Sequence, residues 1–68
     1  MNAFSKNLIE LRKLNKLTQR DVARHLGISQ PSYTRYENGK SEPTIENLIK
    51  LADLFDVSID YLCGRVSY

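Results

Sequence analysis

Side chains that can read the edges of DNA bases come close together between residues 30 and 35. A glutamine such as Gln30 can make two hydrogen bonds to adenine, and an arginine such as Arg35 can make two to guanine. If this segment is helical, its outward positions are Gln30, Pro31, Thr34 and Arg35. The sequence therefore predicts a helix that reads DNA bases with these four residues.

Each of these residues also has a plainer interpretation. Gln30 could be an ordinary solvated glutamine, although the surrounding pattern favours a base contact. Arg35 could hold a phosphate instead of a guanine. Pro31 and the methyl group of Thr34 offer apolar surface to thymine methyls, but Pro31 could be present only to begin a helix. Ser32 could reach a phosphate or a base edge, or simply fill the first turn.

Phosphate contacts are expected on both sides of the reading helix. Gln19 opens the preceding helix, where free backbone N–H groups and the positive end of the dipole favour an anion. Asn38 and Lys40 follow the reading helix, and we favour phosphate contacts for them over the plainer interpretation as a helix terminus and a solvated lysine. We predict phosphate contacts from Gln19, Ser32, Asn38 and Lys40, which would position the reading helix without specifying a sequence.

Residues 18–38 have the pattern of two short helices joined by a glycine turn. Thr18 can cap a helix that has Asp21 at its third position, a close variant of the capping box. Gly27 can end that helix in the left-handed conformation, and Ser29 begins the next helix at once. Because only about three residues separate them, the two helices must cross at a large angle, as in a helix-turn-helix.

Three further helices are expected around this pair because apolar residues recur at helical spacing. They cover residues 3–15, a segment that begins after Thr44, and residues 59–63 after Ser58. Asp56 can end the second of these in the left-handed conformation, though less easily than glycine. The residues expected in the core include Phe4, Leu8, Leu11, Val22, Ala23, Leu26, Tyr33, Tyr36, Ile45, Leu48, Leu51, Ala52 and Phe55. No strand, repeat or linker is visible, so we predict an all-α, compact five-helix domain.

Residues 1–68 can form only one small domain, in which little surface is buried. Cys63 is the only cysteine and His25 the only histidine, which excludes an internal disulfide and leaves no ligand set for structural zinc. Association with a second copy is the remaining source of stability. The lone thiol and the absence of a signal peptide or a membrane-length apolar run indicate the cytoplasm.

Charge is divided along the chain, although the net charge is only +2. The first 41 residues carry eight Lys or Arg against three acidic residues, whereas the remainder carries two against five. The basic half suits a polyanion, and the acidic half should face away from it.

The segment 57–68 has more apolar residues than one short helix can bury alone. We predict that part of this surface forms a dimer interface, with Leu62 at its centre. The predicted interface residues are Ile59, Tyr61, Leu62 and Cys63, with Val57, Val66 and Tyr68 nearby.

Four stretches of the sequence together resemble one known family. These stretches are LRKLNKLTQ, VARHLGIS, YTRYENGKSEPT and LIKLADLFDVSIDYL, which follow one another with nearly gapless spacing. In them the chain resembles the Cro/repressor-type helix-turn-helix regulators of phages and bacteria, often called the Xre family, over nearly its whole length. The resemblance implies a lambda-repressor-like fold.

The resemblance also implies roles for particular residues. It places a base contact at Gln30, a phosphate contact at Gln19, and a structural ion pair between Arg12 and Glu37 that locks the reading helix against the first helix. The family commonly dimerises through its C-terminal end, and a two-fold dimer sets its reading helices about 34 Å apart, one turn of DNA.

From these observations we expect a sequence-specific regulator of transcription that binds double-stranded DNA, most simply a repressor acting as a homodimer on a palindromic site. The alternative is an antitoxin-like or other protein-binding regulatory module. The sequence contains no nucleophile and base set, no paired-carboxylate site and no phosphate-binding glycine loop, so we expect no enzyme activity. No cofactor, metal or membrane partner is expected.

Overall fold

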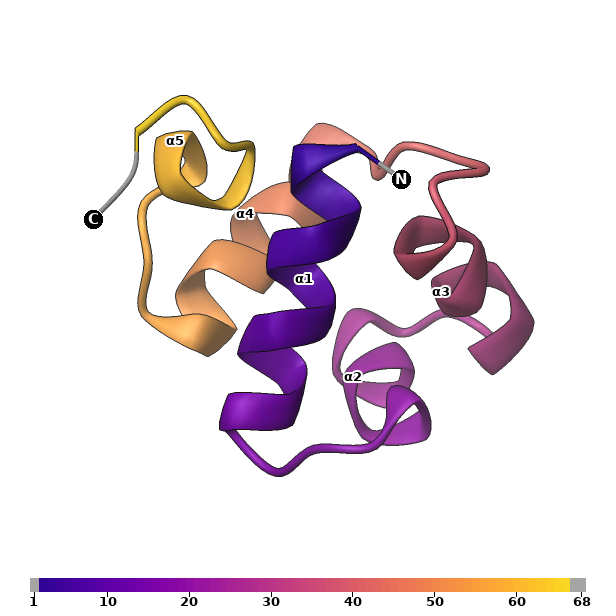
Figure 1. Cartoon of the computed structure of the whole chain (residues 1–68). Coiled ribbons are helices and arrows are strands. Elements are labelled where there is room, and N and C mark those ends of the chain that lie inside the picture. The colour runs from indigo at the N-terminus through magenta and orange to yellow at the C-terminus, as the bar shows by residue number, and fades with distance from the viewer. Residues whose placement is uncertain (1, 67–68) are drawn as a thin grey trace.

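The computed structural model describes residues 2–66, which fold into five α-helices without strands. The helices are α1 (Ala3–Leu14), α2 (Gln19–Leu26), α3 (Gln30–Glu37), α4 (Ile45–Phe55) and α5 (Ile59–Leu62). In Figure 1, α1 runs through the middle of the molecule, with α2 and α3 on one side of it and α4 and α5 on the other. The prediction of an all-α, five-helix fold is confirmed. Tyr68 of the predicted dimer region lies outside the described residues.

Every helix begins at a residue whose side chain accepts a hydrogen bond from the backbone N–H three residues later. The capping residues are Asn2, Thr18, Ser29, Thr44 and Ser58. At the start of α2 the contact is reciprocal, because the Thr18 N–H also donates to the carboxylate of Asp21 at 2.9 Å. Such caps satisfy backbone N–H groups that have no partner within the helix.

Each of the five helices is followed within two residues by a residue in the left-handed conformation, which is a glycine after α2, α3 and α5. Gly27 has φ +74° after α2, as expected, and Asp56 has φ +54° after α4. Lys16, with φ +58°, does the same after α1, which the sequence did not indicate. For a residue with a Cβ atom this conformation is strained, so Lys16 and Asp56 each cost some stability.

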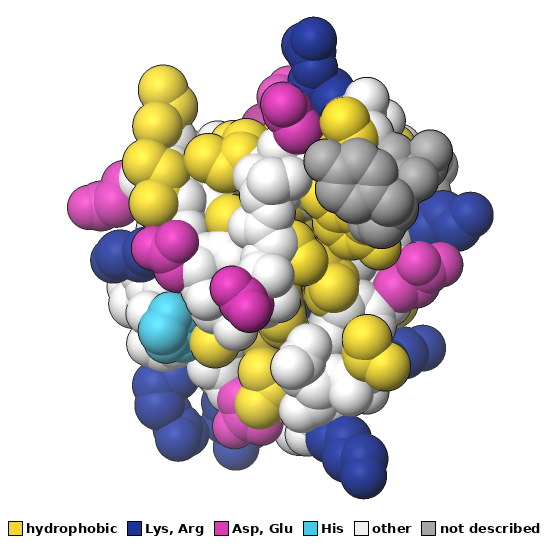
Figure 2. Space-filling model, turned by 90° about the vertical axis from the view of Figure 1, so that its left-hand side faces the viewer, with side chains coloured by type: hydrophobic (Ala, Val, Ile, Leu, Met, Phe, Trp, Pro, Cys, Tyr) yellow, Lys and Arg dark blue, Asp and Glu magenta, His cyan; other side chains and the backbone are white. Residues whose placement is uncertain are grey.

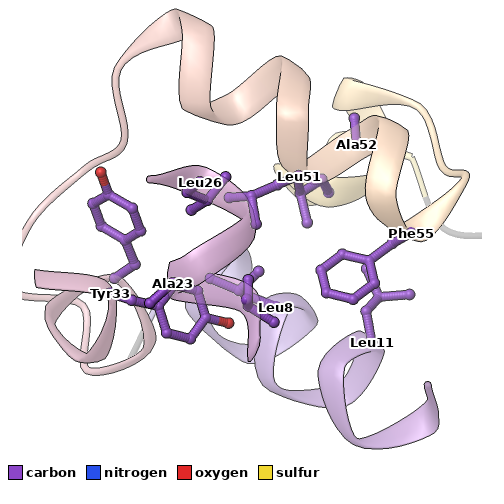
Figure 3. Close-up of a cluster of buried hydrophobic side chains, with 11 residues drawn as sticks. Leu8, Leu11, Ala23, Leu26, Tyr33, Leu51, Ala52 and Phe55 are labelled. Atoms are coloured by element: carbon purple, nitrogen blue, oxygen red, sulfur yellow. The ribbon is translucent and has the colours of Figure 1, made fainter. Parts of the chain in front are cut away.

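The core collects apolar side chains from all five helices. Its buried members are Leu8, Leu11, Val22, Ala23, Leu26, Tyr33, Tyr36, Leu51, Ala52, Phe55 and Leu62. Figure 3 shows the labelled side chains of α1, α2 and α4 pointing toward one another between these helices. This single core holds α2 and α3 at a fixed angle against α1 and α4.

Ile45 does not belong to this core, although its spacing on α4 predicted that it would. Its side chain is 77% exposed. Ile45 is the first residue of α4, so it lies at the end of the helix, beyond the residues that pack against α1 and α2.

The position of Leu62 also differs from the prediction, because its side chain is 0% exposed within the single chain. The Asn7 side chain donates to the backbone carbonyl of Tyr61 at 3.0 Å and so holds α5 against α1. Gly64 permits a very close approach, since a Cβ atom there would lie 2.5 Å from that of Ala3. Leu62 is thereby drawn into the monomer core, and the prediction that it lies at the centre of a dimer interface is wrong.

Candidate nucleic-acid interface

Helix α3 has a buried face and an exposed face. Tyr33, Tyr36 and Glu37 are buried against the rest of the domain. Four of the predicted DNA-contacting residues are exposed on the other face, namely Gln30, Pro31, Ser32 and Arg35. Thr34 lies between the two faces and is half-buried.

The buried carboxylate of Glu37 connects three helices. It is only 2% exposed and receives two hydrogen bonds from the Arg12 guanidinium of α1, at 2.6 Å and 3.1 Å. The Tyr33 hydroxyl of α3 donates to it at 2.5 Å, and the Gln19 amide of α2 donates to it at 3.0 Å. The structure thus contains the ion pair between Arg12 and Glu37, within a larger network.

The Glu37 carboxylate stays ionised near neutral pH. Burial alone would raise the pKa of Glu37, but hydrogen bonds from Arg12, Tyr33 and Gln19 outweigh it and hold the pKa below its usual value. The hydrogen bond to Glu37 raises the pKa of Arg12. Burial, together with the bond to Glu37, raises the pKa of Tyr33, so its hydroxyl stays protonated and donates. The network therefore holds α3 against α1 and α2 with an ionised carboxylate at its centre.

Gln19 has contacts that the sequence did not reveal. Its amide oxygen accepts a hydrogen bond from the Thr34 hydroxyl at 2.8 Å, while its amide nitrogen donates to Glu37. One N–H of the Gln19 amide remains for a phosphate, so the phosphate prediction for this residue stays open. Only the crossing of α2 over α3 brings residues 19, 34 and 37 together, and no local pattern in the sequence encodes it.

The two ends of α3 present different polar groups. At the beginning, Gln30 and the first turn of α2 line a shallow surface hollow of about 240 Å³, whose residues are Thr18, Gln19, Arg20 and Gln30. Arg20 was not among the predicted contacts, although a basic residue beside Gln19 could have indicated it. At the other end, the Arg35 guanidinium donates to the Lys40 carbonyl at 3.3 Å, and Asn38 and Lys40 are both exposed. Cationic and amide groups thus flank the exposed face of α3 at both ends.

Comparisons with known proteins identify the family to which this fold belongs. A family model described as helix-turn-helix matches residues 8–62. The chain is 51% identical over 59 residues to the uncharacterised HTH-type transcriptional regulator YqaE of Bacillus subtilis, covering 87% of this chain and 51% of that protein. It is 48% identical over 62 residues to the cryptic phage CTXphi transcriptional repressor RstR of Vibrio cholerae, covering 91% of this chain and 55% of that protein. The chain therefore spans about half the length of these curated relatives.

A solved structure gives the same answer for the fold. The DNA-binding domain of the P22 C2 repressor superimposes with a TM-score of 0.82 and 30% sequence identity, over 98% of this chain and 92% of that one. The expected lambda-repressor-like fold is confirmed. Within residues 2–66, no helix is long and apolar enough to cross a membrane.

Proposed function

The chain belongs to the Cro/repressor-type helix-turn-helix family of transcriptional regulators, and on that premise we propose that it binds double-stranded DNA of a preferred sequence with α3 in the major groove. One observation carries this proposal. The polar residues Gln30, Ser32 and Arg35 all lie on the exposed face of a helix whose opposite face is anchored in the core. A rigid helix of this kind can present side chains to base edges at fixed positions.

In this proposal, contacts divide between bases and phosphates. Gln30, Pro31, Thr34 and Arg35 face the bases, with Gln30 pairing with an adenine. Gln19, Ser32, Asn38 and Lys40 hold phosphates on either side and position α3 in the groove. We add Arg20 to the residues that contact phosphates, because it lines the same surface hollow as Gln30.

We further propose that the protein represses transcription as a homodimer on a palindromic site. Figure 2 shows the α4 and α5 side of the molecule, where hydrophobic side chains emerge among acidic ones. Ile59 is 38% exposed and Ile49 is 44% exposed, while Tyr61 and Cys63 are half-buried. These residues take the place of Leu62 in the proposed interface, and two copies paired through them would read two half-sites. We propose repression in particular because the Vibrio cholerae relative is named a transcriptional repressor.

This function places the protein where bacterial or phage DNA is, in the cytoplasm. The two relatives described above are named as a transcriptional regulator and a transcriptional repressor. We propose DNA binding without enzyme activity and without a cofactor for this chain as well.

Selection from a random duplex library, followed by a salt titration on the selected duplex, tests the proposal. Enrichment of a two-fold symmetric sequence is expected, with log affinity falling steeply and linearly as log salt rises because phosphate contacts release counterions. A chain that enriches no sequence, and whose weak DNA binding hardly responds to salt, would contradict DNA reading and favour the antitoxin-like, protein-binding alternative.

A further inference from the structure

We infer that Thr34 reads a thymine through its methyl group, because its hydroxyl is engaged by Gln19. The inference rests on the proposed function and assigns one base preference within it. It also gives Gln19 a positioning role that is separate from any phosphate contact.

The orientation of the Gln19 amide is determined by both of its neighbours. Its nitrogen faces the Glu37 carboxylate at 3.0 Å, and its oxygen faces the Thr34 hydroxyl at 2.8 Å. Reversing the amide would place its carbonyl oxygen against the carboxylate, and two acceptors repel each other. Movement of Glu37 to relieve this contact would break the hydrogen bonds that Arg12 and Tyr33 donate to its other carboxylate oxygen.

The fixed amide in turn determines what Thr34 can offer to DNA. A hydroxyl has one hydrogen to donate, and that of Thr34 already goes to Gln19. Thr34 therefore has no hydrogen for the acceptor atoms N7, O6 or O4 in the major groove. With the hydroxyl committed to Gln19, the methyl group on the same Cβ atom is the group of Thr34 that remains for contact with a base.

Thymine is the base that this arrangement fits. Its 5-methyl group is the one apolar feature among the major-groove edges of the four bases. Contact between that methyl group and the methyl group of Thr34 removes apolar surface from water without requiring a hydrogen bond from either. We expect a thymine at one fixed position in each half-site, next to the base read by Gln30 or Arg35.

The test replaces each thymine of the selected duplex in turn by uracil, which differs only in lacking the methyl group. The protein is compared with three variants, Thr34→Ser, Thr34→Val and Gln19→Met. At one position in each half-site, uracil should weaken binding of the wild-type protein about fourfold, the value of one buried methyl group. Thr34→Ser removes only the methyl group, so this difference should disappear. Thr34→Val keeps the methyl group, so the difference in affinity between thymine and uracil should remain.

Gln19→Met keeps the length of the side chain but releases the Thr34 hydroxyl. The ratio of thymine to uracil affinity should then fall below that of the wild-type protein, because Thr34 can rotate. Loss of a phosphate contact alone would lower both affinities and leave the ratio unchanged, so an unchanged ratio overturns the positioning role of Gln19. Melting temperatures of the variants check that each remains folded.

Two other results would overturn the inference and have different meanings. If Thr34→Ser keeps the full discrimination, or Thr34→Val loses it, Thr34 reads through its hydroxyl oxygen or reads nothing, while sequence-specific binding stands. If the wild-type protein prefers no duplex at all, the proposed function fails and the inference fails with it.

Discussion

Glu37 is the residue on which the position of α3 depends most. Four donor groups from Arg12, Gln19 and Tyr33 converge on its carboxylate, and they belong to three helices. Removing one partner of such a pair leaves a buried group without compensation, which costs more than the pair itself contributes.

Glu37→Gln should therefore reduce the free energy of unfolding at pH 7 by about 3 kcal/mol. The folded-state pKa of Glu37 is lowered, so its contribution is present above the unfolded-state pKa and is lost as pH falls through the folded-state pKa. The stability difference between wild type and Glu37→Gln should thus be constant near neutral pH and shrink in acid. Denaturant unfolding measured from pH 7 to below the ordinary pKa of a glutamate checks this, with exposed Glu10→Gln as the control. A difference that does not change with pH would mean that the carboxylate charge is not what holds α3.

Lys40 tests the phosphate contacts at the same scale. Lys40→Ala should weaken binding on all sequences equally and reduce the slope of log affinity against log salt by about 0.9, the value for one phosphate contact. Lys50→Ala, on α4 in the acidic half of the chain, is the matched control and should leave the slope unchanged. An unaltered slope for Lys40→Ala would remove this residue from the phosphate contacts.

At the scale of elements, the helix ends show where local sequence and fold agree. The caps at Thr18, Ser29 and Ser58 were predictable because each depends on a hydrogen bond within three residues. The left-handed residue Lys16 was not, because a lysine gives no signal for that conformation.

Asp56→Gly should stabilise the domain by about 1 kcal/mol, because glycine adopts the conformation at φ +54° without strain. Lys16→Gly should act in the same direction. Thermal or denaturant unfolding measures the gain, and Asp53→Gly, at an exposed position inside α4, serves as the control that should destabilise. If Asp56→Gly lowers stability instead, the Asp56 side chain makes a contact that offsets its backbone strain.

At the scale of the whole molecule, the site depends on contacts that are distant in sequence. Spacing on single helices was enough to predict that Gln30, Pro31 and Arg35 of α3 are exposed, but not that Thr34 is half-buried. It could not predict that Gln19 contacts Thr34 and Glu37, because the crossing of α2 and α3 determines that. Leu62 was misassigned for the same reason, since the approach of Gly64 to Ala3 buries it. The prediction that Ile45 is buried was wrong because a helix can extend beyond the core against which its apolar face packs.

A charged residue should have different effects at the two ends of α5, Ile59 and Leu62. Ile59→Glu should produce a folded monomer, because the side chain is exposed in the single chain and a charge there disrupts only an interface. Leu62→Glu should unfold the domain, because the charge would enter the core. Sedimentation and circular dichroism distinguish the two variants, and Ile59→Glu should also weaken binding to a palindromic duplex, since linked half-sites bind more tightly than one. A wild-type protein that stays monomeric both free and on such a duplex would rule out the dimer.

The most direct test of the whole account is the affinity of wild type and Gln30→Ala for the selected duplex and for a shuffled duplex of the same composition. The wild-type protein should prefer the selected duplex by about a thousandfold or more. Gln30→Ala should lose about 1 to 3 kcal/mol on the selected duplex, relax the preference at one base position, and bind the shuffled duplex as the wild type does. Equal losses on both duplexes, or no loss on either, would contradict the claim that α3 reads DNA sequence through its exposed face.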